Sequence, residues 1–563
     1  MNLPRLALGL LLLGLLGAAG WWGLGREAAA PAPGVARVAE AVRASAPGED
    51  LPPAGTRSLF DHLLAQNDGL PWPFEKLVAL VAAQSPGGEP PLVLMIPHGR
   101  SLLKASADFA RPRVLLAADV QAPGTPASLG LNLRGQLFLG FVEAANEIEV
   151  LSYNERAGRY EFQLVQNYCE NCVPRIVYAR RAICTSCHQG GAPIFPQRPW
   201  SETNGQPEIA EAIVAARGGE PYLGVPPRAA LAVPERYDEL TDFGAFLLAA
   251  QAAWAAVEVP TRRQMTELAL RYAAEPGAFG DGGVLAQDLR AVAPAGWPAA
   301  GIAVAESDLR NRDPLLEPAI SGRGLRGFWY TRVRPPAQPP GAKDNEDLEA
   351  FDRLPRLPAE LDPLSPRPPR RLLAPGSLDA VYGLAQLFSA EDLARLDAAA
   401  GYQRERWLAA LQRVPETVWQ APALSRVDLL QALLADPALG GQTLAYCCLD
   451  TAEMSEPVAS GVPPLAIAEG SVLRHYERYC FACHRGNPAA RLNFMAGSDE
   501  AEVLARIRDT AKIRDALDWT RYAGTDQAGQ LMPPVDSPQY ALLQQDPQAI
   551  EAMREAVPGL FDF

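Results

Sequence analysis

The sequence predicts a multidomain α+β protein with a β-rich N-terminal part, a mainly helical middle and an all-α C-terminal domain. Five short apolar runs with strand character lie between residues 92 and 165. Amphipathic helical patterns dominate the chain from residue 207 to about 326 and again from 377 to 438. The last part of the chain is helical around short loops, and 563 residues are enough for three or four domains.

Composition and charge narrow the classes of partner. The chain is 48% hydrophobic and 21% charged, which is ordinary for a globular protein, and its formal net charge is −14. An acidic chain is a poor match for a phosphate backbone, so we expect no nucleic acid partner. A basic redox partner protein, or solubility alone, fits this charge.

The first 25 residues predict a signal peptide or a membrane anchor. Arg5 precedes an apolar run that is close to the length needed to span a bilayer, and paired Trp21 and Trp22 suit a membrane interface. Small residues that would permit cleavage are present, so both readings stay open, and we favour an uncleaved helix in the inner membrane. Residues 26–55 are rich in Ala and Pro and predict a tether, which places the rest of the chain in the periplasm or another exported compartment.

Residues 56–205 predict a β-rich domain. Two short amphipathic helical patterns, at 58–66 and 73–83, come first. The last two strands flank a loop that contains glycine, which predicts a hairpin. The expected strands are Leu92 to Ile96, Val114 to Ala118, Leu137 to Val142, Ile148 to Tyr153 and Tyr160 to Val165.

The middle of the chain predicts two helical regions separated by a proline-rich segment. Residues 206–330 contain helical patterns at 242–257 and 260–274, the second with proline at its start. Residues 331–376 are dense in proline and charge and predict an extended segment. Residues 377–465 return to helices, and capping-box patterns start at Ser389 and Ser425.

The C-terminal domain, residues 466–563, contains a motif for covalent attachment of c-type haem. Cys480 and Cys483 are followed at once by His484, and two thiols one helical turn apart can each form a thioether with a haem vinyl group. The adjacent histidine then supplies an axial nitrogen to the iron. Met532, followed by two prolines, offers a soft sulfur for the opposite face. The alternative is a disulfide or thioredoxin-like pair that happens to precede histidine.

This domain resembles the class I c-type cytochromes, in which a helix leads into CxxCH, a Met-Pro sequence follows and a last helix closes the fold. Here Ser471 can cap the first helix, a second helix is expected from Ser498, and the last is expected at 547–557. The resemblance implies that Cys480 and Cys483 are the thioether sites and that His484 and Met532 are the axial ligands.

A second CxxCH ends the β-rich domain. Cys184, Cys187 and His188 are followed by glycines and by apolar residues that can cover a flat cofactor. The segment loosely resembles exported bacterial cytochromes of unassigned role, which implies haem but no reaction. For the sixth ligand of this haem, His98 is our candidate. Met95 and His62 are other possible donors upstream of the motif, and the last alternative is an iron position open to a small molecule.

Four further cysteines predict disulfides in an oxidising compartment. Cys169 and Cys172 form a CxxC for which closure on itself is the simplest pairing, while Cys447 and Cys448 are adjacent and would make a strained bridge. Pairing between the two sites, a metal site and a redox-active CxxC are the alternatives.

Together these features predict an exported dihaem c-type cytochrome that passes electrons between redox partner proteins. The alternative is an enzyme of the dihaem peroxidase or oxygenase type, in which the His188 haem reacts and the haem of His484 and Met532 feeds it electrons. The long interval between the two motifs and the lack of an evident distal acid or base argue against the enzyme. A haem sensor or scaffold is a third reading, although no output domain is encoded.

Overall fold

The computed structural model describes most of the chain beyond residue 49. The described residues are 50–67, 69–84, 90–97, 107–120, 127–184, 188–194, 203–275, 297–299, 301–304, 371–447, 450–459, 465–485, 494–510, 513, 516–522, 531–533 and 543–556. The predicted anchor, most of the tether and most of the proline-rich segment lie outside these residues. Within the described part, no helix is long and apolar enough to span a bilayer.

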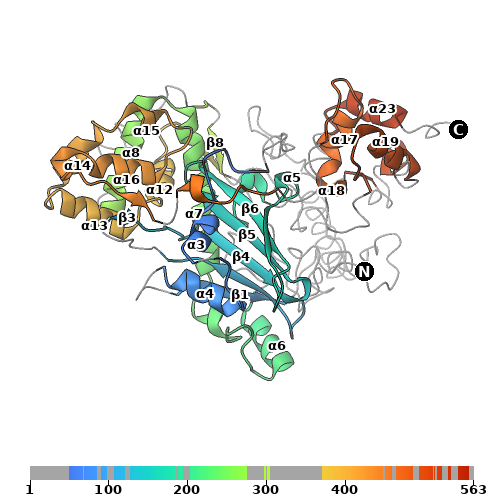
Figure 1. Ribbon diagram of the computed structural model, residues 1–563, viewed down its shortest axis with the longest axis horizontal. Coiled ribbons are helices and arrows are strands. Elements are labelled where there is room, and N and C mark those ends of the chain that lie inside the picture. The colour runs from blue at the N-terminus through green and yellow to red at the C-terminus, as the bar shows by residue number, and fades with distance from the viewer. Residues whose placement is uncertain are drawn as a thin grey trace, which may run out of the picture. The chain divides into compact units, whose positions relative to one another are not determined.

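The protein is mixed α+β, as predicted, and is built around one antiparallel sheet of six strands (Figure 1). The spatial order of the strands is β1-β2-β4-β5-β6-β7. Their bounds are Leu92–Ile96 (β1), Arg113–Ala117 (β2), Leu137–Val142 (β4), Glu147–Asn154 (β5), Arg159–Gln166 (β6) and Arg175–Tyr178 (β7). The five predicted strands are therefore present, two of them with the predicted bounds.

The predicted hairpin is also present, since β5 and β6 pair in register from Ile148 with Val165 to Asn154 with Arg159. The prediction missed β7, which has only four residues and pairs with the end of β6. Two small sheets were also missed because each joins segments far apart in sequence. These sheets pair β3 (Ser128–Leu129) with β10 (Ala445–Tyr446) and β8 (Ile302–Val304) with β9 (Arg371–Leu373).

Two short helices, α3 (Leu59–Ala65) and α4 (Phe74–Ala82), cover one face of the sheet. A capping box between Ser58 and Asp61 starts α3, at the beginning of the helix predicted at 58–66. The Phe60 amide donates to the Ser152 hydroxyl on β5 (2.9 Å), and Phe74 of α4 stacks on Phe141 of β4 with ring centroids 5.1 Å apart. These contacts define the α3/α4 face of the sheet.

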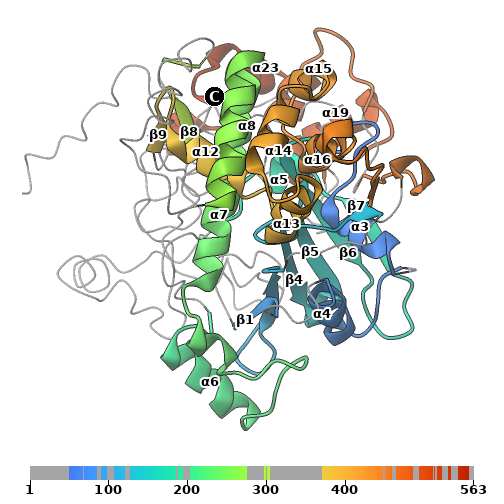
Figure 2. The ribbon, with the colours of Figure 1, turned by 90° about the vertical axis from the view of Figure 1, so that its left-hand side faces the viewer.

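The long helix α7 (Arg236–Ala256) packs against the other face at one end of the sheet (Figure 2). Tyr237 meets the edge of Phe138 with centroids 6.0 Å apart. Gly244 is required at the crossing, since a Cβ there would lie 2.5 Å from the hydroxyl of Tyr160. The prediction started this helix six residues late, because Tyr237 and Leu240 are the only large apolar residues among the charged ones of its first turns.

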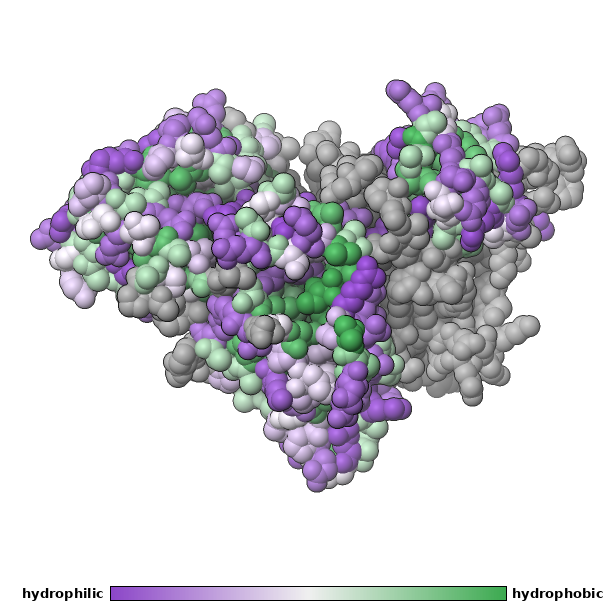
Figure 3. Space-filling view, in the orientation of Figure 1, coloured by the Kyte–Doolittle hydropathy of each residue, from purple (hydrophilic) through white to green (hydrophobic). Residues whose placement is uncertain are grey.

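The remaining helices of this part share a single hydrophobic core with the sheet. Gly383 of α12 lets that helix approach α7 closely, because a Cβ would lie 2.5 Å from the carbonyl oxygen of Phe246. On the face shown in Figure 3, hydrophobic residues gather over the middle of the sheet. The helices are α5 (Arg181–Cys184), α6 (Pro207–Arg217), α8 (Val259–Ala274), α12 (Leu378–Ala385), α13 (Ala390–Ala399), α14 (Arg404–Leu411), α15 (Glu416–Gln420) and α16 (Arg426–Leu434).

A buried arginine ties the β5–β6 hairpin to these helices. Arg426 is 1% exposed and bonds to Glu155 of the hairpin loop (2.9 Å), to Asp392 of α13 (2.8 Å) and to the carbonyl of Gly130 (2.7 Å). The predicted capping box at Ser389 is complete. At Ser425 only the serine side chain caps the helix, and the carboxylate of Asp428 pairs with an arginine instead.

The C-terminal helices enclose a second hydrophobic core. The expected first helix has Leu473, Tyr476 and Tyr479 as its buried residues. Asp499, one residue after the expected Ser498, caps the next helix. The helices are α17 (Leu473–Tyr479), α18 (Phe481–His484), α19 (Glu500–Asp509), α21 (Trp519–Tyr522) and α23 (Pro547–Glu555).

Candidate haem-attachment sites

The first CxxCH begins in α5, and the neighbouring strand β6 fixes where that helix starts. The amide of Ala179 donates to the carbonyl of Phe162 (2.8 Å). Two residues back along β6, the carbonyl of Tyr160 accepts from the guanidinium of Arg181 (2.8 Å). The arginine side chain thus takes the position of a strand partner where β7 has ended. The backbone amide of Arg181 donates to Asp50 (2.8 Å), which satisfies a donor at the start of the helix.

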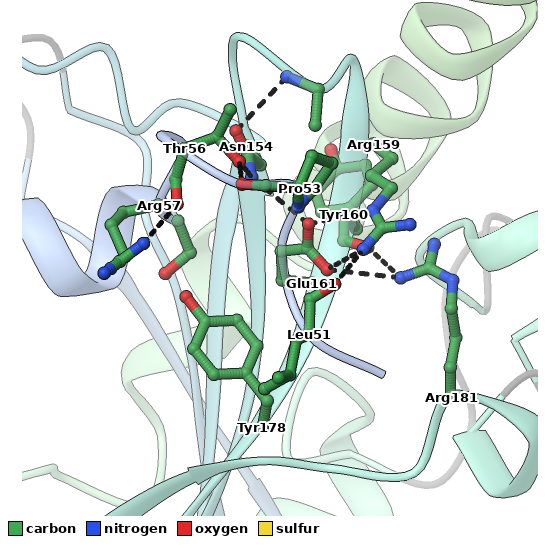
Figure 4. Close-up of polar contacts among 12 residues, drawn as sticks. Leu51, Pro53, Thr56, Arg57, Asn154, Arg159, Tyr160, Glu161, Tyr178 and Arg181 are labelled. Atoms are coloured by element: carbon green, nitrogen blue, oxygen red, sulfur yellow. Dashed lines mark hydrogen bonds and ion pairs between the residues drawn. The ribbon is translucent and has the colours of Figure 1, made fainter. Parts of the chain in front are cut away.

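A buried carboxylate holds this arginine (Figure 4). Glu161 is fully buried and lies between Arg159 (2.8 Å) and Arg181 (3.4 Å). Asn154 donates to the same carboxylate (3.2 Å). A buried carboxylate needs such partners because burial of an unpaired charge is costly. The cluster therefore fixes the strand edge from which the first CxxCH departs.

The two CxxCH motifs make the same local hydrogen bond. The amide of His188 donates to the carbonyl of Cys184 (2.9 Å), and the amide of His484 donates to the carbonyl of Cys480 (3.0 Å). In each motif the histidine amide is therefore bonded to the carbonyl four residues earlier, which is the bond spacing of an α-helix. Cys187 lies outside the described residues.

The imidazole of His188 is held in a defined orientation. Its Nδ1 lies 2.9 Å from the carbonyl oxygen of Ala192, which can only accept, so Nδ1 carries the proton and Nε2 is the basic nitrogen. The ring meets Phe162 edge-on, with centroids 5.3 Å apart, and Arg181 lies over the same phenylalanine. Burial lowers the pKa of His188, which favours the neutral form.

These features match what a metal-binding histidine requires. A ligating histidine commonly donates its other ring N–H to a carbonyl or carboxylate, which fixes the tautomer and raises the basicity of the free nitrogen. His188 has such a hydrogen bond to the Ala192 carbonyl, and burial favours its neutral form, which is the form that binds a metal. The described residues of the first motif are thus suited to an axial haem ligand.

A disulfide joins Cys169 and Cys172 in the turn between β6 and β7. The amide of Cys172 also donates to the carbonyl of Cys169 (3.2 Å), so the turn is closed twice. This is the pairing that the spacing suggested as simplest. Cys447 is disulfide-bonded as well, while Cys448 lies outside the described residues.

The sheet separates two of the three upstream groups considered as sixth ligands from His188. Met95 pairs with Val114, and Val114 with Phe141, so Met95 lies on the α3/α4 face. His62 belongs to α3 on that same face. Phe162, which contacts His188, points to the opposite face, because its neighbour Gln163 bonds to Ser58 beside α3. Met95 and His62 therefore lie on the sheet face opposite to Phe162, and His98 lies outside the described residues.

The second site is built from α17 and α18 in the C-terminal core. Tyr476 and Tyr479 anchor α17 to the last helix, since their hydroxyls donate to the carbonyl of Met553 (2.7 Å) and to Asp546 (2.9 Å). Burial and the Asp546 contact raise the pKa of Tyr479 to about 12. The ring of His484 lies against Phe494, with centroids 4.5 Å apart.

Met532 lies on a short described segment that reaches the same core. Its amide donates to the carbonyl of Ala516 (2.9 Å), and the preceding Leu531 is fully buried in the cluster that contains Cys480. The backbone that carries the predicted sulfur ligand is therefore part of the core around the CxxCH. The side chain of Cys483 lies outside what the structure describes.

Sequence reasoning missed the residues that orient the first site. Phe162 was assigned to a strand and Ala192 to the segment after the motif, but neither was expected to contact His188. Arg181 and Glu161 gave no motif signal. Only the alternation of strand residues could have indicated that Glu161 and Phe162 point to opposite faces.

Comparisons with known proteins identify no relative, because no family model, no curated protein and no solved structure matches this chain. Among the described residues, no cluster of three or more His, Cys, Asp or Glu side chains could hold a metal ion.

Proposed function

We propose that this chain is an exported c-type cytochrome with two covalently attached haems that passes electrons between redox partner proteins. Cys184, Cys187 and His188 would hold one haem, and Cys480, Cys483, His484 and Met532 would hold the other. The iron of a bound haem supplies one-electron exchange. The protein residues attach the haem, orient the axial imidazole and exclude water.

One observation carries this proposal. In both CxxCH motifs the histidine amide donates to the carbonyl of the first cysteine, and at His188 the Ala192 carbonyl leaves Nε2 as the basic nitrogen. A disulfide CxxC does not require an oriented histidine beside it. The oriented imidazole therefore favours haem over the thioredoxin-like alternative.

The proposal includes a particular arrangement of domains. The β-rich part with its CxxCH would be the first haem domain, the central helices would enlarge its core, and residues 466–563 would form an all-α domain of the class I cytochrome type. The separate hydrophobic core of the C-terminal helices supports this division. We further propose that the protein is periplasmic and held at the inner membrane by its first 25 residues.

Mass spectrometry of purified protein tests the proposal directly. Two haems should add two porphyrin masses to the chain, and haem staining of a denaturing gel should be positive. The variants Cys184→Ser and Cys480→Ser should each bind one haem less tightly. A bare-chain mass would refute the proposal, and one porphyrin mass would leave only one site.

A dihaem peroxidase or oxygenase is the second candidate, and the position of Met95 and His62 favours it. Both lie on the sheet face opposite to Phe162 and His188, so two upstream donors are removed from the first site. Whether His98 ligates the iron then decides between a six-coordinate carrier and a centre with an open position. Ferric spectra with a high-spin component, or a CO adduct after reduction, would support the enzyme, while two low-spin haems that ignore CO would support the carrier.

A further inference from the structure

A buried arginine lies on the sheet face that carries the first haem site. Leu115 pairs with Gly140, and Arg113 lies two residues before Leu115, so Arg113 points to the same face as Gly140. Glu149 is also paired with Gly140, and Leu151, two residues further, is paired with Phe162. Arg113, Glu149 and Phe162 therefore share one face.

Gly140 allows this arginine to cross the sheet. The guanidinium of Arg113 on β2 reaches over β4 to pair with the carboxylate of Glu149 on β5. A Cβ at Gly140 would lie 2.4 Å from Nη2 of Arg113, so a larger residue would displace the guanidinium. The side chain is thus laid flat across the sheet and fixed at its far end.

The two charges of this pair have unequal effects. The side chain of Arg113 is 10% exposed, whereas that of Glu149 is 58% exposed. Water screens an exposed carboxylate strongly, while a buried cation acts through a medium of lower dielectric constant.

We propose that Arg113 is a positioning residue that sets the reduction potential of the haem bound at His188. A fixed, buried positive charge on this face disfavours the additional charge of the oxidised iron and therefore raises the potential. Glu149 holds the guanidinium in place and, being exposed, offsets its charge only in part. This inference rests on the proposed function, because it requires haem at the first motif.

Redox titration of the full chain, followed by visible absorption, tests this. Arg113→Met should lower the potential of the first haem by at least a threefold change in the one-electron equilibrium, which is about 28 mV at 59 mV per tenfold. Arg113→Lys, which keeps the charge, should stay close to the wild type. Gly140→Ala should also lower the potential of the first haem. This variant tests the inference if Arg113→Met does not fold.

Two controls separate a local charge effect from a general one. Arg156→Met removes an arginine of the β5–β6 loop whose side chain is 42% exposed and paired with Asp428, and it should leave the potential of the first haem unchanged. The potential of the second haem should also stay constant. The inference is overturned if Arg113→Met leaves the potential of the first haem unchanged, or if Arg113→Lys lowers it as far as Arg113→Met does. Either result leaves the proposed function intact. Absence of haem from the first motif of the wild type refutes the proposed function itself.

Discussion

Replacing Arg426 with methionine should destabilise the larger core strongly. The guanidinium is 1% exposed, and its loss would leave the carboxylates of Glu155 and Asp392, each 4% exposed, without their cation. Burial lowers the pKa of Arg426, but Asp392 and Glu155 outweigh burial and raise it, so the side chain stays charged. Removing one partner of a buried ion pair costs about 3–5 kcal/mol. We expect Arg426→Met to lose a free energy of unfolding in this range.

Urea denaturation followed by tryptophan fluorescence measures this loss, because Trp254, Trp407 and Trp419 are buried in the same core. Arg228→Met is the matched control. Its ion pair with Glu211 is also short (2.6 Å), but both side chains are more than half exposed, so its midpoint should not change. A triple variant that adds Glu155→Gln and Asp392→Asn to Arg426→Met should recover part of the loss.

The size of the effect decides whether this reasoning is correct. If Arg426→Met stays within about 1 kcal/mol of the wild type, the buried carboxylates have found water or another partner. The argument from desolvation would then fail. A loss that the triple variant does not reduce would show that packing, rather than unpaired charge, is responsible.

Other perturbations address ligation and pH. Met532→Ala should abolish the long-wavelength band of methionine-ligated ferric haem, while His188→Ala should leave it intact, and survival of the band in Met532→Ala would place the sulfur ligand elsewhere. Folding lowers the pKa of His62 from 6.5 to about 4, because of its burial and because Arg156 and Arg57 repel the charged ring. Between these two pKa values the unfolded chain binds a proton that the folded chain does not bind. The free energy of unfolding therefore decreases as the pH is lowered through this window, by up to about 1.4 kcal/mol per pH unit. His62→Gln should lose less stability over the same window, and equal losses in both proteins would contradict the assignment.

The periodic elements of this fold were predictable because each is dictated locally. The strands Leu92–Ile96 and Leu137–Val142 have the predicted bounds, since continuous apolar runs between turn residues fit a buried strand. The helix after Ser58 and the helix after Ser389 begin where a capping box satisfies the first amides. Strand β7 was missed because four residues carry too little pattern to register.

The sequence by itself determined the two CxxCH motifs and the mixed α+β class, and it indicated Cys169–Cys172 as the simplest disulfide, because spacing and composition express these locally. Only the tertiary structure decided which face of the sheet each group occupies. A strand shifted by one residue would reverse every face, and strand pairing is fixed by contacts between distant segments. That long-range register separates Met95 and His62 from His188 and brings Arg113 across Gly140 to Glu149 on the same side as Phe162.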